Sequence, residues 1–213
     1  MYVFRCHYST SSRHYYKTKQ LAPVMTYSDI PQILLHTDTI YLAPPTIDRA
    51  QEVHTLIQGF TQPHFEFLSW TNKTISLDDT YLNMKTAIKN FETNNAEYKF
   101  LIINKHSEDL LGCASLFIRQ LRIPYFEVGY WIGSENMGRG YASAACTLIR
   151  DIAADFLGAK RIELKTARRN IYSIRVAQRA GFECEAILRD SRVDNAEVVD
   201  DTCVYVFTGA SAR

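Results

Sequence analysis

The sequence predicts one α/β domain in which helices flank a mixed, mostly antiparallel central sheet. Three strand-like segments follow one another in the middle of the chain with only short turns between them, which indicates an antiparallel meander. A later strand–helix–strand run indicates one crossover with a parallel pair of strands. The 213 residues and the apolar content of 46% suit a single domain with a substantial core.

The domain is expected to begin with a strand and a helix. Residues 39–45 (TIYLAPP) form a strand-like run that two prolines close. Thr46 is expected to cap a helix that runs to about Ile57, with Ala50, Val53 and Ile57 on its buried face.

A second helix is predicted behind an aromatic segment. Residues 59–74 are interrupted by Pro63 and predict a short helix followed by a loop. Ser76 and Asp79 have the spacing of a capping box, which predicts the start of a longer helix. Its apolar stripe is expected to belong to the core and consists of Leu77, Tyr81, Met84, Ile88 and Phe91.

The antiparallel meander and the crossover follow. The meander strands are expected at 98–104, 110–120 and 125–132. The later elements are a helix at 138–157, a strand at 161–166, a helix at 171–180, strands at 182–188 and 198–207, and an acidic loop at 190–197. Glycines at 158 and 181 are expected to end the two helices.

The N-terminal part differs in composition, and residues 1–36 are assigned to a poorly ordered extension ahead of a domain at 37–213. Residues 1–28 contain four basic residues and no acidic one. This composition is typical of an organelle transit sequence, although the amphipathic period is missing. We favour the alternative of a loose extension from an upstream start, with Met25 as the working start.

Composition and spacing argue against several classes of protein. A net charge of +1 does not fit non-specific nucleic-acid binding, and no apolar run approaches the ~20 residues of a membrane span. The five cysteines have no CxxC spacing and the six histidines include no HExxH, so neither a disulfide framework nor a metal site is expected. A reducing, cytoplasmic location is the simplest interpretation, and the choice between monomer and homodimer stays open.

The segment 135–156 (ENMGRGYASAACTLIRDIAADF) combines a glycine-rich turn with a helix start. Unpaired backbone N–H groups and the helix dipole favour an anion there, and Gly138 and Gly140 let a phosphate or pyrophosphate approach the backbone closely. Arg139 would add positive charge. The alternative is that the glycines only shape a tight strand-to-helix turn. The antiparallel strands ahead of the glycines argue against a nicotinamide-binding oxidoreductase, and the missing GK[ST] argues against ATP or GTP.

Two longer stretches carry a family resemblance: YFEVGYWIGSENMGRGYASAA at 125–145 and NIYSIRVAQRAGFECEAILRD at 170–190. Together they resemble the GCN5-related N-acetyltransferase (GNAT) superfamily, and within it the RimJ/RimL branch, which acetylates the N-termini of ribosomal proteins. The resemblance covers residues 37–208. It implies the GNAT fold, with a sheet splayed between its fourth and fifth strands, and acetyl-CoA as acetyl-donor cosubstrate without a metal.

The resemblance also implies where acetyl-CoA binds. Its pyrophosphate would lie on the backbone of Met137, Gly138, Arg139, Gly140, Tyr141 and Ala142. The pantetheine arm would follow the strand ending Tyr130, Trp131 and Ile132, with Asn170 and Ser173 on its other side. Glu135 stands where the usual superfamily signature has Gln or Arg.

Direct attack by the amine on the thioester needs a base, an oxyanion donor and an acid for the departing thiolate. Many relatives use a tyrosine at the position of Ala177 as the acid; Ser173 is the candidate here, with the alternative that it only satisfies its own helix. Asn170 is expected to order the arm or a water. Glu127 is the candidate base, acting through a water, and the equal alternative is an ion pair on its strand. Glu185 is a second candidate with the same alternative.

The resemblance points to a protein N-terminal α-amine as the acceptor. A small amine, such as a polyamine, an amino acid or an aminoglycoside, is the near alternative, and a non-catalytic acyl-CoA-binding module is the more distant one. A groove open at both ends would favour a peptide. His64 with Phe65, Phe67 and Trp70 would line the acceptor groove, unless these aromatic residues only pack on the core.

Overall fold

The computed structural model describes residues 26–71 and 74–208. In chain order, its main elements are β1 (Ile40–Ala43), α1 (Ala50–Gln58), α2 (Gln62–Phe67), α3 (Leu77–Thr93), β2 (Glu97–Asn104), β3 (Leu110–Gln120), β4 (Tyr125–Ile132), α4 (Tyr141–Asp151), β5 (Arg161–Ala167), α5 (Ile171–Arg179), β6 (Glu183–Val193) and β7 (Val199–Phe207).

The strands form one seven-stranded sheet in the order β1-β2-β3-β4-β5-β7-β6. Every neighbouring pair is antiparallel except β4 and β5, which are parallel and joined by the α4 crossover. Residues 125–128 of β4 pair with 161–164 of β5, and the pairing ends there. Because each strand continues while paired with its other neighbour, β4 and β5 diverge. The predicted fold class and the splayed sheet are therefore confirmed.

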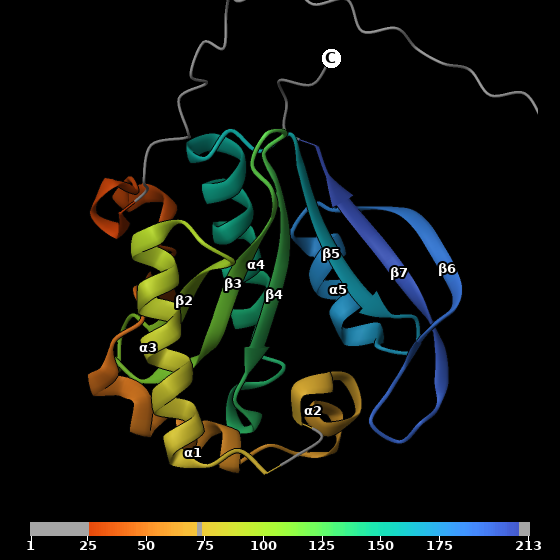
Figure 1. Ribbon diagram of the computed structural model, residues 1–213, viewed down its shortest axis with the longest axis horizontal. Coiled ribbons are helices and arrows are strands. Elements are labelled where there is room, and N and C mark those ends of the chain that lie inside the picture. The colour runs from red at the N-terminus through yellow and green to blue at the C-terminus, as the bar shows by residue number, and fades with distance from the viewer. Residues whose placement is uncertain (1–25, 72–73, 209–213) are drawn as a thin grey trace, which may run out of the picture.

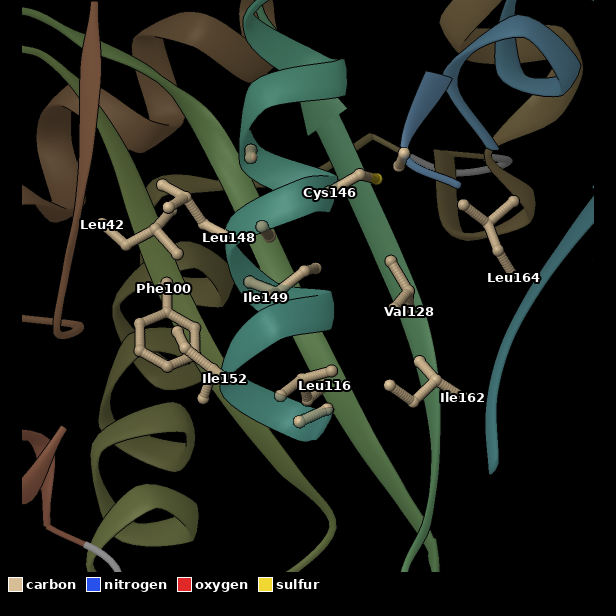
Figure 2. Packing of buried hydrophobic residues seen from close by; sticks show 14 of the residues in the cluster. Leu42, Phe100, Leu116, Val128, Cys146, Leu148, Ile149, Ile152, Ile162 and Leu164 are labelled. Atoms are coloured by element: carbon tan, nitrogen blue, oxygen red, sulfur yellow. The ribbon is translucent and has the colours of Figure 1, made fainter. Parts of the chain in front are cut away.

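Helices cover both faces of the sheet (Figure 1). α4 and α5 lie on one face, where the larger core cluster is built, and α1 and α3 lie on the other. Figure 2 shows Leu148 and Ile149 of α4 against Leu42 of β1, Phe100 of β2 and Leu116 of β3. Side chains of β4 alternate between the two faces, so Tyr130 points to the α4 and α5 side.

The long predicted helix starts later and ends differently than expected. Gly138 and Gly140 have φ angles of 74° and 85°, which a right-handed helix does not contain, so α4 begins at Tyr141. After Asp151 the chain continues as a π-helical turn, Ile152–Phe156, and Gly158 ends it with a φ of 64°. The first three predicted residues therefore form a loop with open amides.

The last hairpin is longer than predicted. β6 runs to Val193, and Arg192 and Val193 pair with Asp200 and Val199. A bulge between Leu188 and Arg192 interrupts the ladder, which broke the sequence alternation and made this part resemble a loop. The acidic loop predicted at 190–197 is thus confined to 194–198.

The residues just ahead of the predicted domain start at 37 pack on the sheet. Residues 27–29 and 32–34 form two short 3-10 turns, and Ile30 and Leu35 are buried in the larger core cluster. Residues 1–25 of the predicted extension lie outside the described part of the chain.

Helix α3 begins as predicted, because Ser76 and Asp79 make the capping box. Its buried face is turned slightly from the predicted stripe. Met84 and Phe91 are buried as expected, together with Thr80 and Ala87, while Leu77, Tyr81 and Ile88 are half-buried.

Candidate active site

A cleft of about 1600 Å³ occupies the place where β4 and β5 diverge. Its walls come from both faces of the sheet, including α5 on one side and α3 on the other. The predicted cofactor-binding residues that line it are Tyr130, Trp131, Ile132, Met137, Gly138, Gly140, Tyr141, Ala142, Asn170 and Ser173. The exposed Arg139 is not among the lining residues.

The start of α4 opens into this cleft. A Cβ atom placed on Gly138 or Gly140 would meet no atom within 4 Å, so the backbone there is open to a ligand. Gly140 occupies the N-cap position, and no side chain caps the helix there. The amides of the first turn therefore face the cleft without an internal partner, which suits an anion. The Met137 amide differs, because it donates to the Ser134 carbonyl within the preceding turn.

The start of α5 faces β4 across the cleft. Asn170 is the N-cap of α5, and its Oδ1 accepts a hydrogen bond from the Ser173 amide at 3.0 Å. The Ser173 side chain does not serve its own helix. Its Oγ accepts a 3.0 Å hydrogen bond from the Tyr130 hydroxyl on β4.

The Tyr130 side chain is a site group that the sequence interpretation missed, since only its strand position was considered. Burial raises the pKa of Tyr130, so its hydroxyl keeps its proton throughout the neutral range. The signal that could have found it is the alternation of β4, which places Tyr130 on the same side of the sheet as α5.

The two carboxylates considered as bases are in ion pairs. Glu127 lines the cleft, and it accepts hydrogen bonds from Arg119 Nε at 3.1 Å and from Lys165 Nζ at 3.2 Å. Glu185 is exposed and accepts from Arg161 on β5. Lys165 also contacts Glu163 at 2.9 Å. Glu127 and Glu185 therefore make the ion pairs that were the alternative to a role as catalytic base.

His64 is a structural residue of α2. It is buried, its ring stacks on Phe60 at 4.1 Å, and its Nε2 donates to the Ile132 carbonyl at 2.8 Å. Its Nδ1 accepts a hydrogen bond from the Thr61 amide at 3.3 Å, so both ring nitrogens are engaged within the fold. Trp70 extends the aromatic cluster to Trp131, and both line the cleft. The α2 segment thus both packs on β4 and borders the cleft, while Phe65 is not among the lining residues.

Among the described residues, no group of three His, Cys, Asp or Glu side chains is arranged to hold a metal ion. In residues 26–71 and 74–208, no helix is long and apolar enough to cross a membrane.

Comparison with known proteins gives one family. The model of the acetyltransferase (GNAT) domain matches residues 39–183. A Bacillus subtilis (strain 168) protein named "Probable N-acetyltransferase YjcK" is 31% identical over 73% of this chain and 87% of its own. A Bacillus licheniformis protein named "Uncharacterized N-acetyltransferase p20" is 25% identical over 80% of this chain and 95% of its own.

Solved structures have the same fold at low identity. The microcin C7 self-immunity acetyltransferase MccE, in complex with acetyl-CoA and AMP, has a TM-score of 0.74 at 22% identity and covers 83% of this chain and 99% of its own. The ribosomal L7/L12 α-N-protein acetyltransferase RimL, in complex with coenzyme A, has a TM-score of 0.76 at 19% identity. The match covers 86% of this chain and 99% of the RimL chain. With the family model matching most of the chain, this protein belongs to the GNAT acetyltransferases and is an acetyl-CoA-dependent N-acetyltransferase.

Proposed function

We propose that this enzyme acetylates the α-amino group of a protein N-terminus by direct attack of the amine on the thioester. The observation that carries the proposal is a cleft whose walls belong to both faces of the sheet. Acetyl-CoA can then enter on the α4 and α5 face, and a chain end on the α3 face. Structural neighbours that include RimL support this acceptor.

The α4 start and the β4 edge are the parts that fit acetyl-CoA. The open amides after Gly140 suit the pyrophosphate. Beyond Val128, residues 129–131 of β4 have no β5 partner, so their backbone groups on that side are available to an extended amide-containing arm, whereas the Ile132 carbonyl is already bonded to His64. The bound cosubstrate supplies the activated acetyl group.

We assign the acid step to Ser173. Tyr130 donates to the Ser173 oxygen, which leaves the serine's own proton free to point at a thiolate in the cleft. Ala177 leaves α5 without a tyrosine in the position that many relatives use, and Tyr130 supplies a hydroxyl from β4 instead. Tyr130 is thus a positioning residue for Ser173, and Asn170 orients the turn that carries Ser173.

The Glu127 carboxylate is bonded to two cations, so it would have to break an ion pair to take a proton. We propose that a water in the cleft accepts the ammonium proton and that Glu127 holds the side chains of Arg119 and Lys165 in place.

The four described cysteines, Cys113, Cys146, Cys184 and Cys203, are free thiols, which supports a reducing cytoplasmic location.

The positioning role predicts a defined loss for Tyr130→Phe. Phenylalanine keeps the ring packing but removes the hydrogen bond to Ser173, so kcat is expected to fall about 10-fold while the KM for acetyl-CoA stays within twofold. If Tyr130 only supported the fold, its loss would lower kcat whether or not the Ser173 hydroxyl is present. The double variant with Ser173→Ala is therefore the test, and it should be no slower than Ser173→Ala alone.

The acceptor class is tested with purified enzyme, acetyl-CoA and three acceptors: a peptide with a free N-terminus, the same peptide N-terminally blocked but containing lysine, and a polyamine. We expect mass spectrometry to show acetylation of the free N-terminus only. Turnover of the polyamine alone would establish the small-amine alternative. Binding of acetyl-CoA without turnover of any amine would establish the non-catalytic module.

A further inference from the structure

One aromatic side chain of β3 covers the backbone of β4 beside the gap between β4 and β5. A Cβ atom placed on Gly129 would lie 2.7 Å from Cε2 and 3.6 Å from Cζ of Phe117. Phe117 pairs with Glu127 on β4, so its ring reaches diagonally along β4 to cover Gly129. The ring therefore occupies the space that a side chain at position 129 would need.

The Phe117 ring lies on the face of the sheet where we place the acceptor. Leu116 and Ile118 pack in the core cluster on the α4 and α5 face, so the side chain between them points to the α3 face. By the same alternation, the free side of Gly129 is opposite to that of Tyr130. Both Phe117 and Gly129 line the cleft, so the ring is part of the cleft wall on the α3 face.

Charged neighbours hold this part of the wall in place. The Arg119 guanidinium lies 5.4 Å from the centre of the Phe117 ring, and Arg119 bonds to Glu127 at 3.1 Å. Lys165 of β5 reaches the same carboxylate across the strands at 3.2 Å. The attraction between a cation and an aromatic face restricts the ring, because the cation is itself fixed by an ion pair. The ring, Glu127 and Lys165 thus lie together at the narrow end of the gap.

The narrow end of the gap is also where the acyl group is expected. β4 and β5 stop pairing after Val128 and Leu164 and separate from there on (Figure 1), so Gly129 is the first residue of β4 beside the gap. Ser173, to which we assign the departing thiolate, bonds to the side chain of Tyr130, the next residue. A thioester with its sulfur beside Ser173 would therefore direct its acyl group through the gap at this level, toward the Phe117 ring.

We propose that Phe117 is a specificity-determining residue that limits the acyl group to acetyl. Acetyl places a single methyl group at this point, and every further methylene of a propionyl or butyryl chain extends toward the ring. The ring is held against Gly129 and Arg119, and forcing extra methylenes against packed side chains is unfavourable. This inference rests on the placement of the thioester under the proposed function, and it does not depend on the identity of the acceptor.

The test is calorimetric titration of the enzyme with coenzyme A, acetyl-CoA and butyryl-CoA in the absence of an acceptor. The wild-type enzyme is expected to bind butyryl-CoA about 10-fold more weakly than acetyl-CoA. Phe117→Ala is expected to bring the two dissociation constants within about twofold of each other, because it removes the ring from the path of the longer chain. The affinity for coenzyme A, which has no acyl group, should stay that of the wild type.

Two further variants make the titration decisive. Phe117→Leu keeps an apolar side chain of smaller size, so it should give an intermediate ratio, and it provides the test if Phe117→Ala does not fold. Leu82→Ala is the matched control, because Leu82 also lines the cleft but belongs to α3 and is 65% exposed. Its ratio of dissociation constants should equal that of the wild type.

Three results would overturn the proposal: a wild-type enzyme that binds butyryl-CoA as tightly as acetyl-CoA, an unchanged ratio in a folded Phe117 variant, and an equal loss of affinity for all three ligands in that variant. The last result would mean that the ring supports the coenzyme A site as a whole. If the ratio changes as expected but no peptide N-terminus is acetylated, the protein-acceptor proposal fails and the role of Phe117 stands.

Discussion

Replacing Ser173 with alanine is expected to lower kcat on the order of 100-fold and to leave acetyl-CoA binding unchanged. Ser173 faces β4 across the cleft, and its oxygen is already occupied as an acceptor by the Tyr130 hydroxyl. Its own proton is therefore the one available to a departing thiolate, and losing a positioned proton donor typically costs 10²–10⁴-fold. The helix should survive, because its cap is the Asn170 side chain bonded to the Ser173 backbone amide.

The measurement is steady-state kinetics combined with calorimetric titration of acetyl-CoA. A selective loss of kcat with an unchanged dissociation constant supports the acid role. Equal losses in kcat and in affinity would mean that Ser173 holds the cosubstrate instead. Full turnover in a folded Ser173→Ala enzyme would place the acid elsewhere. Ser191→Ala is a suitable control, because Ser191 is exposed on β6 and its hydroxyl bonds to the nearby Leu188 carbonyl.

Gly140→Asp is expected to weaken coenzyme A binding about 100-fold while the protein stays folded. Gly140 is the N-cap of α4, where an aspartate would place its carboxylate beside the first-turn amides that suit the pyrophosphate. The added negative charge would repel the pyrophosphate. The left-handed φ of 85° adds some backbone strain, although no atom lies within 4 Å of a new Cβ.

Two controls separate charge from strain. Asparagine in Gly140→Asn tolerates the left-handed backbone and has nearly the size of aspartate without its charge, so a smaller loss of affinity is expected. Gly158→Asp has a similar φ of 64° and equally open surroundings, but it does not line the cleft, and its affinity should equal that of the wild type. The readout is the rise in melting temperature with added coenzyme A, which follows from binding to the folded state. An unchanged rise in Gly140→Asp would remove the α4 start from the binding site.

Local sequence patterns predicted most of the fold. The strands of the meander were found because alternation, turn residues and length are all local signals, and the bounds of β3 and β4 agree with the prediction. The bounds of β6 and α4 were predicted wrongly because the local signals at these places were misleading. A bulge interrupted the alternation of β6, and two glycines that looked like the beginning of a helix are in the left-handed region ahead of it.

The candidate site, too, has a part that local sequence predicts and a part that it does not. The glycine-rich turn and the NxxS motif are each a single short stretch of chain. The sequence alone therefore determined the open start of α4 and the bond from the Ser173 amide to the Asn170 cap. Tertiary structure decided what these groups contact. Tyr130 and Ser173 are 43 positions apart, and His64 and Ile132 are 68 apart. Such contacts depend on the register of the sheet, the divergence of β4 and β5 and the way α2 and α5 pack against them. No local pattern of residues contains that information, because it is fixed only when the whole core assembles.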